Sequence, residues 1–334
     1  MRVLKWIGVI LVLILLLYVI GPYPKKPVIN TIPIVIDTSI SLVELEQIIS
    51  SKENKVRYLR EHNQAKIIWA DAHKIKTPYA IVYLHGFSAS HAEGEPIHRH
   101  VAQRYGCNLF LSRLYAHGLE EPEPLLSLTT EKLIASAKEA IAIGKQLGDK
   151  VILMSTSTGG TLSLLLAGND PAVAGLILYS PNIDLYDSKS FLLTKPWGLQ
   201  LARLVIGDRY YRFHAPQVAQ PYWNTKYRIE ALIELKSMMN ATMTEETFRK
   251  VKQPVFMGYY YKDKMHQDDV VSIPRMFEMF NQLGTVKALK RKIDFPDAGY
   301  HVIASSYWTS NTHEVENETC KFLEEIMYLK PQQK

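Results

Sequence analysis

Short apolar runs alternate with longer amphipathic stretches from about residue 65 to the end of the chain. A run of about 4 to 8 mainly apolar residues has the length of a buried strand, whereas apolar positions three and four apart indicate a helix. Strands are predicted at residues 65–71, 80–84, 108–114, 151–154, 175–181, 254–261 and 290–295. Helices are predicted at residues 96–105, 130–147, 161–167, 272–283 and 311–327. This alternation predicts right-handed crossovers, a mostly parallel sheet, and functional residues at the carboxyl ends of its strands.

The alternation stops between residues 182 and 252. This segment is rich in leucine and aromatic residues, and we interpret it as helices inserted after a strand of the sheet. Most of its aromatic side chains are expected to form the insertion's own core, and some are expected to line an apolar pocket. These aromatic residues are Phe191, Trp197, Tyr210, Tyr211, Phe213, Tyr222 and Trp223.

The N-terminal segment has the pattern of a membrane anchor. Residues Trp6 to Ile20 are uncharged and almost wholly aliphatic, and Arg2 and Lys5 precede them. The length of this run lies between that of a signal-peptide core and the roughly 20 residues of a full span. No small-x-small cleavage site follows, so we predict that residues 1–24 form an uncleaved, single-pass membrane anchor. Lysines flank both ends, and the positive-inside rule gives a slight preference for the remaining chain on the non-cytoplasmic side.

Residues 25–64 are predicted to be a linker followed by a helix. Prolines are spaced along the first part of this stretch. Ser41 and Glu44 then have the spacing of a capping box ahead of an apolar helical pattern. The helix leads directly to the first predicted strand.

The composition is that of an ordinary globular protein. The 334 residues are 47% hydrophobic and 22% charged, which allows a large core and argues against disorder. The formal net charge is +6, but the basic residues are scattered and form no stripe interleaved with aromatic residues, so no nucleic-acid partner is expected. Cys107 and Cys320 form no CxxC motif, and we interpret both as small buried hydrophobic residues, with one disulfide as the alternative. The oligomeric state is left open.

The stretch Lys150 to Gly160 is the strongest candidate for chemistry. A predicted strand, Val151 to Met154, stops at a Ser-Thr-Ser-Thr-Gly-Gly cluster that precedes a helical pattern. A serine at such a sharp turn presents its hydroxyl above the sheet, beside the free N–H groups of the following helix. Only small residues fit two positions before and after it, and Ser157 meets this condition with Ser155 and Gly159. A helix cap rich in serine and threonine is the alternative interpretation.

This SxSxG pattern resembles the GxSxG nucleophile elbow of the α/β-hydrolase family, and more closely that of its monoglyceride lipase and lysophospholipase-like branch. Ser155 departs from the family pattern because it replaces the first glycine. The resemblance covers roughly residues 65–327. It implies an α/β-hydrolase fold, with a mostly parallel central sheet flanked by helices and a helical cap. Residues 65–181 and 253–330 would then form the core, and residues 182–252 the cap.

The resemblance also implies a serine hydrolase that cleaves carboxylic esters through an acyl-enzyme and needs no cofactor. An apolar cap together with a membrane anchor suggests a lipid-like ester, such as a monoacylglycerol or a lysophospholipid. The same scaffold serves small esters, peptidases and acyltransferases, and it is also found in catalytically silent binding proteins. The variant elbow keeps the silent alternative open, whereas a complete order of Ser, Asp and His argues against it.

The sequence LHGF at Leu84 to Phe87 follows a predicted strand. In the family pattern, the amide just after His-Gly helps to bind the oxyanion, and Phe87 is that residue here. Its partner is the amide of the residue after the nucleophile, Thr158. Two donors aimed at the oxygen of a tetrahedral intermediate stabilise its negative charge. Without the resemblance, His-Gly is an ordinary turn from a strand to a loop.

A neutral serine hydroxyl is a poor nucleophile at pH 7 and needs a base. His301 lies in FPDAGYHVI, beyond the last predicted strand, where the family places its catalytic histidine. The acid must come between Ser157 and His301 in chain order. Asp263 directly follows a predicted strand, whereas Asp268 lies closer to the next helix, whose predicted N-cap is Ser272. We favour Asp268 and keep Asp263 as the alternative acid.

Other histidines and acidic residues are weaker candidates. His117 lies in RLYAHG, which matches a family pattern usually written with glycine before the histidine, and either a structural or a substrate-side role fits it. A further cluster is predicted to be a solvated face and no metal site, because two of its histidines are two positions apart on a predicted helix and point to different sides. The cluster consists of His91, Glu93, Glu95, His98 and His100. The chain has no Walker or dinucleotide-binding glycine pattern.

Overall fold

The fold is built around one sheet of mostly parallel strands. The computed structural model describes residues 2–332, and its strands are β1 (Lys66–Ile68), β2 (Thr77–Leu84), β3 (Asn108–Leu111), β4 (Gly148–Thr156), β5 (Val173–Tyr179), β6 (Tyr210–Arg212), β7 (Lys226–Arg228), β8 (Val255–Tyr259) and β9 (Lys290–Asp294). Seven of these described strands form the main sheet, in the order β1-β3-β2-β4-β5-β8-β9. β1 pairs antiparallel with β3, and the other neighbours in this sheet are parallel.

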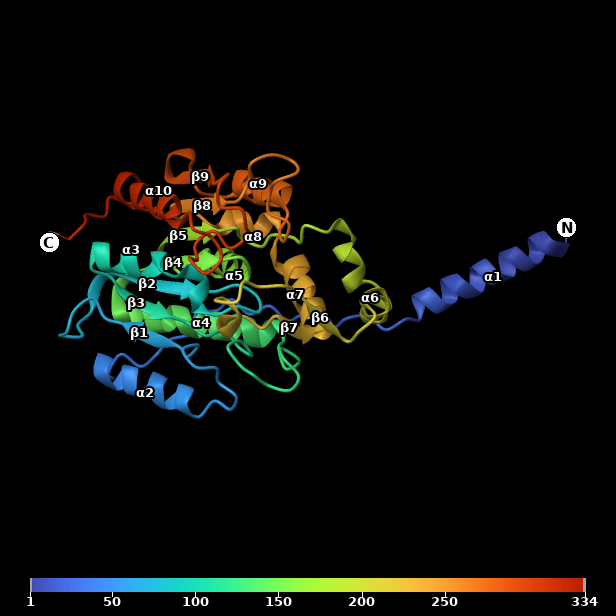
Figure 1. The fold of residues 1–334 in the computed structure, drawn as a ribbon, viewed down its shortest axis with the longest axis horizontal. Coiled ribbons are helices and arrows are strands. Elements are labelled where there is room, and N and C mark those ends of the chain that lie inside the picture. The colour runs from blue at the N-terminus through green and yellow to red at the C-terminus, as the bar shows by residue number, and fades with distance from the viewer. Residues whose placement is uncertain (1, 333–334) are drawn as a thin grey trace.

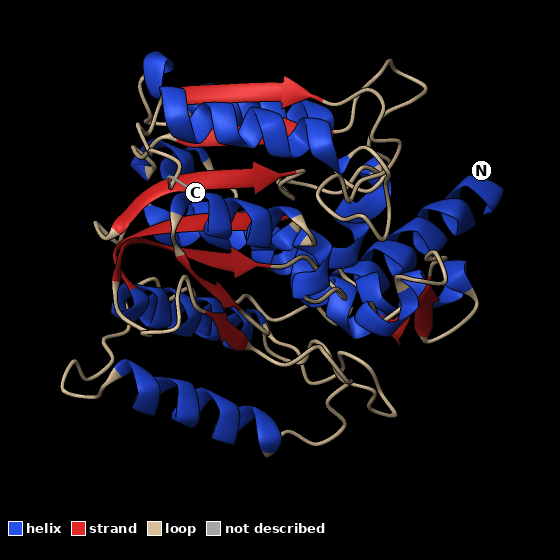
Figure 2. Ribbon diagram, turned by 60° about the vertical axis from the view of Figure 1, so that its left-hand side comes forward, coloured by secondary structure: helices blue, strands red, loops and turns tan. Residues whose placement is uncertain are grey.

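Helices cover both faces of the sheet (Figures 1 and 2). The α-helices are α1 (Arg2–Val19), α2 (Leu42–Asn54), α3 (Ile97–Tyr105), α4 (Thr130–Leu147), α5 (Thr158–Ala167), α6 (Gly198–Ile206), α7 (Ile229–Thr242), α8 (Glu245–Lys250), α9 (Ile273–Gln282) and α10 (Thr312–Glu325). The short 3-10 helices are η1 (His91–Gly94), η2 (Ser188–Thr194), η3 (Gln220–Tyr222) and η4 (Lys287–Leu289). The mostly parallel sheet flanked by helices is the arrangement that the alternation of strands and helices predicted.

Alternate residues of the central strands pack against two different groups of helices. In β2, Val82 belongs to an apolar cluster with residues of α4, α5 and α7, whereas Tyr83 belongs to a cluster with residues of α3 and α10. Leu153 and Met154 of β4 divide between the two clusters in the same way. Successive side chains of a strand point to opposite faces, so a strand buried on both faces is apolar along its length. For this reason the strands were recognisable as short apolar runs.

Several local predictions are confirmed. Ser41 and Glu44 make both hydrogen bonds of a capping box at the start of α2. Ser272 caps α9 with its side-chain hydroxyl. Cys107 and Cys320 are buried and free, so the alternative of a disulfide between them is wrong.

Residues 182–252 lie between β5 and β8. They include η2, α6, η3, α7, α8 and a two-stranded antiparallel sheet of β6 and β7. The sequence pattern did not indicate this small sheet, because each of its strands is only three residues long. Leu235, Met238 and Met239 of α7 join the same apolar cluster as β2 and β4, so this helix is continuous with the main core. In Figure 1, α6 lies farther out, toward the N-terminal helix.

The N-terminal segment forms α1, which projects away from the rest of the molecule in Figure 1. Among residues 2–332, no helix is long and apolar enough to cross a membrane. The uncharged part of α1, Trp6 to Val19, rises by about 21 Å at about 1.5 Å per residue, which is less than the roughly 30 Å of hydrocarbon in a bilayer. The prediction of a single-pass membrane anchor in residues 1–24, with the remaining chain on the non-cytoplasmic side, is therefore wrong.

Candidate active site

Ser157 occupies the turn between β4 and α5, at the carboxyl end of the central strand of the sheet. Its backbone has φ 52° and ψ −118°, a region in which a non-glycine residue is strained. Gly159 packs so closely against the end of β2 that a Cβ there would overlap the carbonyl oxygen of Leu84. The chain therefore has the strand, strained turn and tightly packed helix of a nucleophile elbow.

The hydroxyl of Ser155, which replaces the first glycine of the family motif, is buried and hydrogen-bonded. It accepts a hydrogen bond from the Ser163 hydroxyl at 3.0 Å and donates one to the Ile177 carbonyl oxygen at 3.4 Å. Ser163 lies on α5 and Ile177 on β5. The neighbouring helix and strand thus supply partners for the extra hydroxyl, and the elbow accommodates it.

The loop after β2 passes directly against the nucleophile turn. A Cβ on Gly86 would lie 2.9 Å from the Cβ of Ser157, so only glycine fits at this position. Within residues 2–332, the amides of Phe87 and Thr158 donate no hydrogen bond. Phe87 follows Gly86, which lies against Ser157, and Thr158 is the next residue after Ser157, so these two predicted oxyanion donors lie on the two segments that meet at the Ser157 side chain.

Gly86 is held on both sides of its α-carbon. Its amide donates a hydrogen bond to the carboxylate of Glu93. His85 Nε2 accepts the Leu114 amide at 3.0 Å, so the ring proton lies on Nδ1 and is donated to the Gly86 carbonyl oxygen at 2.9 Å. Burial lowers the pKa of His85 well below its ordinary value, which keeps this tautomer neutral.

His301 follows β9 and contacts Asp268, which follows β8. Nδ1 of His301 lies 2.7 Å from Oδ2 of Asp268, whose side chain is fully buried. The other aspartate oxygen accepts the amides of Val270 and Val271, each at 3.0 Å. The Nδ1 proton is therefore donated to Asp268, and Nε2 is left as an acceptor. Among the described residues, this buried Nε2 has no hydrogen-bond partner.

The charges around His301 favour its protonated form. Burial by itself would lower the pKa of His301, but the charge and hydrogen bond of Asp268 outweigh burial and raise the pKa above 6.5. Asp263, the alternative acid, lies in an exposed turn, where its carboxylate is 3.0 Å from His266 Nδ1. The hydrogen bond from His266 lowers the pKa of Asp263. The structure thus brings Asp268 to His301 and leaves Asp263 at the surface.

Ser180 joins the histidine loop to the end of β5. Its hydroxyl donates to the His301 carbonyl oxygen at 2.9 Å, and its amide donates to the Gly258 carbonyl oxygen at 2.7 Å. The Ser157 amide donates to the carbonyl oxygen of Tyr179, the residue before Ser180, at 3.0 Å. The nucleophile turn and the histidine loop are therefore tied to the same point of the sheet. No sequence motif marked Ser180 for this position.

A small apolar cluster joins three segments near the histidine loop. Its members come from the region after the His-Gly turn, from the insertion and from the histidine loop, and they are Ala89, Ala92, Ala215, Ala219, Trp223 and Val302. Trp223 of the insertion also packs edge-on against Trp308, with ring centroids 5.5 Å apart. Ser157 and His301 are themselves only 5% and 9% exposed.

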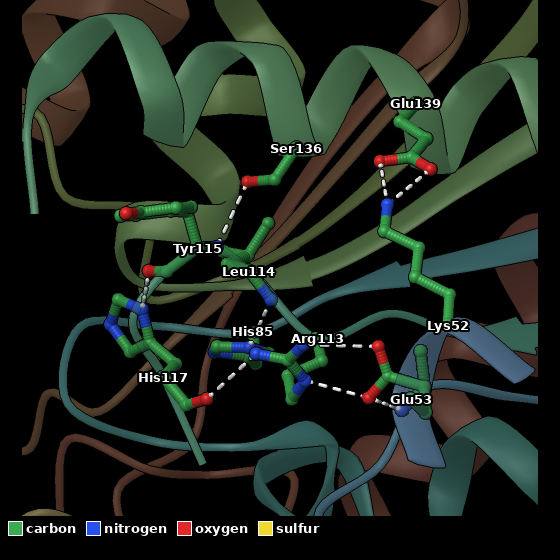
Figure 3. Close-up of polar contacts among 10 residues, drawn as sticks. Lys52, Glu53, His85, Arg113, Leu114, Tyr115, His117, Ser136 and Glu139 are labelled. Atoms are coloured by element: carbon green, nitrogen blue, oxygen red, sulfur yellow. Dashed lines mark hydrogen bonds and ion pairs between the residues drawn. The ribbon is translucent and has the colours of Figure 1, made fainter. Parts of the chain in front are cut away.

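A polar network supports the His-Gly loop from the direction of α2 (Figure 3). Arg113, after β3, pairs with Glu53 at the end of α2 through two contacts of 2.7 and 3.0 Å. The same guanidinium donates to the His117 carbonyl oxygen at 3.3 Å. The His117 ring packs edge-on against the rings of His85 and Phe87, with ring centroids 5.0 Å and 5.9 Å apart. His117 thus lies behind the predicted oxyanion loop.

The cluster predicted to be a solvated face is largely buried. His91, Glu93 and His98 are at most 4% exposed, so the prediction is wrong for these three residues. They are buried because η1 packs between β2 and α3 instead of continuing a surface helix, and a Cβ on its Gly94 would crowd both neighbours. Small residues on either side of Glu93, Ala92 and Gly94, are a sequence signal that could have indicated its burial. Within residues 2–332, no group of three or more His, Cys, Asp or Glu residues is placed to hold a metal ion.

A family model matches most of the chain. The model of the alpha/beta hydrolase family matches residues 81–316, a range that contains the nucleophile elbow, the His-Gly loop and the histidine loop. The chain belongs to the alpha/beta hydrolase family. The predicted family and α/β-hydrolase fold class are confirmed. This alpha/beta hydrolase departs from the family motif at Ser155, where the two hydrogen bonds described above compensate for the lost glycine.

Several lipolytic enzymes are similar to this alpha/beta hydrolase. It is 28% identical over 108 residues to the thermostable monoacylglycerol lipase of Bacillus sp. (strain H-257), and the match spans 32% of this chain and 42% of that lipase. The structure of LipS and LipT, two metagenome-derived lipolytic enzymes, aligns with TM-score 0.63 and 17% identity over 80% of this chain and 99% of that chain. The monoacylglycerol lipase of Paleococcus ferrophilus aligns with TM-score 0.56 and 13% identity over 78% and 98%. The two structural likenesses show the shared fold.

Proposed function

We propose that this alpha/beta hydrolase is a serine hydrolase of carboxylic esters, with Ser157 as nucleophile, His301 as base and Asp268 as the acid that orients His301. The buried contact of 2.7 Å between His301 and Asp268 carries the proposal. A fully buried carboxylate is costly, and here it fixes the ring so that Nε2 can accept a proton. The same contact is the reason for choosing Asp268 rather than Asp263 as the acid that orients His301.

In the first half of the reaction, Ser157 Oγ attacks the ester carbonyl carbon while its proton passes to Nε2 of His301. The resulting imidazolium is stabilised by Asp268, and the carbonyl oxygen, now negative, accepts the amides of Phe87 and Thr158. A donor of this kind typically contributes about 10² to 10³ in rate. The tetrahedral intermediate collapses when Nε2 returns the proton to the departing alkoxide, which leaves an alcohol and an acyl-enzyme.

In the second half, His301 takes a proton from water as the water oxygen attacks the acyl carbon. Collapse of the second intermediate breaks the bond to Ser157 Oγ, which regains its proton from Nε2. The products are a carboxylic acid and the free enzyme. Every proton moves through one ring nitrogen, so the reaction requires no metal or cofactor.

Ester hydrolysis is supported by the family and by the similarity to lipases. The substrate that we propose is a lipid-like ester, such as a monoacylglycerol or a lysophospholipid. This proposal is supported by a group of aromatic rings beside the predicted oxyanion loop. Phe87 packs edge-on against Tyr227 with ring centroids 5.2 Å apart, and the ring centroids of Tyr227 and Phe213 are 6.3 Å apart. We further propose that residues 182–252, which supply both of these partners, act as a cap over a core of residues 65–181 and 253–330.

The test is covalent labelling with a fluorophosphonate, followed by turnover of an ester panel with graded acyl length. The wild type should be labelled once, and Ser157→Ala should lose the label and about 10⁴ to 10⁶ of the hydrolytic rate. Ser155→Ala is the matched control, because it removes a buried hydroxyl of the same turn and should still be labelled.

Labelling or turnover that persists in Ser157→Ala would exclude Ser157 as the nucleophile. A wild type that is labelled but cleaves no ester would overturn the substrate class in favour of a peptidase or an acyltransferase. A wild type that is neither labelled nor active would indicate a catalytically silent binding protein on the same fold.

A further inference from the structure

Glu93 is a buried carboxyl group that the proposed triad does not use. Its side chain lies in η1 and is 2% exposed, and its carboxylate accepts the Gly86 amide. An ionised carboxylate is expensive to bury, and a neutral amide or hydroxyl oxygen could accept one N–H at lower cost. The position of Glu93 therefore calls for a role that depends on its charge.

Glu93 lies very close to the reacting serine. A Cβ on Gly86 would be 2.7 and 2.9 Å from the two carboxylate oxygens of Glu93 and 2.9 Å from the Cβ of Ser157. The carboxylate and the Ser157 side chain thus both border the space that a side chain on Gly86 would fill. The place of η1 is fixed from the histidine loop, because the Ser305 hydroxyl donates to the Ala92 carbonyl oxygen at 2.9 Å.

The hydrogen bond to Glu93 helps to aim the Phe87 amide. Gly86 donates its N–H to Glu93, and its carbonyl oxygen accepts Nδ1–H of His85. The peptide bond between Gly86 and Phe87 is planar, and in the trans form its carbonyl oxygen and N–H point in opposite directions. Fixing Gly86 at both its N–H and its carbonyl therefore fixes the direction in which the Phe87 N–H points.

The charge of Glu93 also acts on His301. After Asp268, Glu93 is the next carboxylate that raises the pKa of His301, and His301 in turn lowers the pKa of Glu93. Burial nevertheless raises the pKa of Glu93 to about 7. Because each group shifts the pKa of the other, their titrations are coupled.

Tyr83 on β2 and His98 on α3 are the titratable groups that crowd Gly94 of η1, His91 lies on η1 itself, and Tyr222 lies in η3, which packs against η1. Burial raises the pKa of Tyr83 well above its ordinary value and lowers the pKa of His98 well below its own, so both are neutral near pH 7. Tyr222 stacks on Tyr307 with ring centroids 5.0 Å apart. His301 is the histidine whose pKa the charge of Glu93 raises.

We propose that Glu93 is a positioning residue whose carboxylate holds the Gly86 amide, so that the Phe87 N–H faces the oxyanion, and whose charge joins that of Asp268 in stabilising the His301 imidazolium. This inference rests on the proposed function. Protonation of Glu93 on the acid side removes its charge just as protonation of His301 removes the base. Activity therefore falls as the pH drops through the coupled titration, and this acid limb lies at higher pH than that of an ordinary histidine because the pKa of His301 is raised.

The test separates charge from shape with two variants. Glu93→Gln keeps the size of the side chain and an oxygen that can accept the Gly86 N–H, but it has no charge. Glu93→Asp keeps the charge on a side chain one methylene shorter. Glu95→Gln is the control, because Glu95 is a neighbouring carboxylate that bonds to Arg99 at 2.8 Å outside the site.

Two measurements are made across pH on each folded variant: the rate of fluorophosphonate labelling, and the NMR resonance of the Nδ1 proton that His301 shares with Asp268. In Glu93→Gln, the transitions of both signals should move to lower pH by about 1 unit, and labelling at high pH should slow about three- to tenfold. In Glu93→Asp, the pH midpoint of both signals should stay near that of the wild type because the charge is kept. Labelling should still slow because the shorter side chain holds the Gly86 amide less well. Glu95→Gln should match the wild type.

A wild-type transition in Glu93→Gln would overturn the proposal, whether or not labelling is slower, because a merely structural residue would slow labelling without moving the pKa of His301. The NMR titration needs no ester and no reaction. A wild type without labelling or turnover would therefore count against the proposed function, whereas the His301 titration would still decide whether the charge of Glu93 acts on the ring.

Discussion

Ser155 has a hydroxymethyl side chain where the family motif has the hydrogen atom of glycine. The hydrogen bonds of its hydroxyl group explain why the elbow tolerates this side chain. Ser163 donates to it from α5, and it donates to the Ile177 carbonyl oxygen of β5. A buried polar group of this kind is harmless while all its partners are present. Removing one partner alone leaves the other buried without a bond.

Ser155→Gly should therefore keep labelling and activity near the wild-type level but lower the free energy of unfolding by about 1 to 3 kcal/mol, because the Ser163 hydroxyl loses its acceptor. The double variant Ser155→Gly/Ser163→Ala should be less destabilised than the sum of the two single variants. Urea denaturation followed by circular dichroism measures all three. Additive losses would mean that the pair contributes no coupling to stability.

The choice between the two acids is tested by matched amide variants. Asp268→Asn should lower kcat about 10³- to 10⁴-fold, because an amide cannot hold His301 in the tautomer that leaves Nε2 free. Asp263→Asn should cost about tenfold or less, because its partner, His266, lies with it in an exposed turn. Turnover at saturating ester, with both variants folded, is the measurement. The reverse ranking would make Asp263 the acid.

Residues in recognisable local patterns could be found from the sequence, and residues placed by distant contacts could not. Ser157 and His301 each stand in a short motif after a strand. Glu93 and Ser180 reach the site only because η1 packs on β2 and because β5 lies between β4 and β8. The small residues beside Glu93 could indicate its burial, but neither Glu93 nor Ser180 stands in a sequence motif that indicates its role.

At the scale of elements, the strands and the long helices followed from apolar periodicity, because burial on one or both faces dictates that pattern. The exceptions have physical reasons. β6 and β7 are too short to alternate visibly, and α1, despite its apolar run, is not among helices long and apolar enough to cross a membrane, of which the described residues contain none. The apolar cluster with Trp223 and Val302 brings together three separate segments, which no single stretch of sequence reveals.

Trp223→Ala should loosen the part of the insertion that packs on the histidine loop, because it removes the ring that contacts Trp308 and belongs to an apolar cluster with Val302. We expect faster tryptic cleavage at Arg212 and Lys226 in the small sheet, together with a higher KM for long-chain esters. Limited proteolysis read by mass spectrometry, and steady-state kinetics, are the measurements.

Tyr186→Ala is the control for this variant, since Tyr186 is half exposed and lies outside that cluster. It should leave both the cleavage sites and KM unchanged. If Trp223→Ala also shows wild-type cleavage and KM, the cluster does not hold this part of the insertion in place.

At the scale of the whole molecule, two of the ion pairs that join α2 to the rest of the fold differ sharply in burial (Figure 3). Glu53 and Arg113 are 7% and 11% exposed at their side chains, whereas Lys52 and Glu139 are 57% and 42% exposed. Breaking a buried pair leaves an uncompensated charge inside the protein. An exposed pair is solvated in either state and contributes little.

Glu53→Gln should therefore lower the free energy of unfolding by about 3 to 5 kcal/mol. Glu139→Gln breaks the pair with Lys52, the residue before Glu53 on α2. This variant should lower the free energy of unfolding by about 1 kcal/mol or less, and the difference from the wild type should vanish at high salt. Chemical denaturation at low and high salt compares the two variants. Equal losses in both would show that burial of the Arg113 pair does not determine its contribution.

Ser157 and the His-Gly loop come from the first half of the chain, whereas Asp268 and His301 follow the last two strands of the sheet. At about 5 to 20 residues per second, a ribosome needs roughly 7 to 30 seconds to proceed from Ser157 to His301. In the sheet order, β8 and β9 add to one side of the strands that precede them, so those earlier strands can pair first. On the proposed assignment, a nascent chain carries the serine and its oxyanion loop during this interval but no base. Reactivity toward an ester would then arise only when the final strand docks, so synthesis itself would delay it.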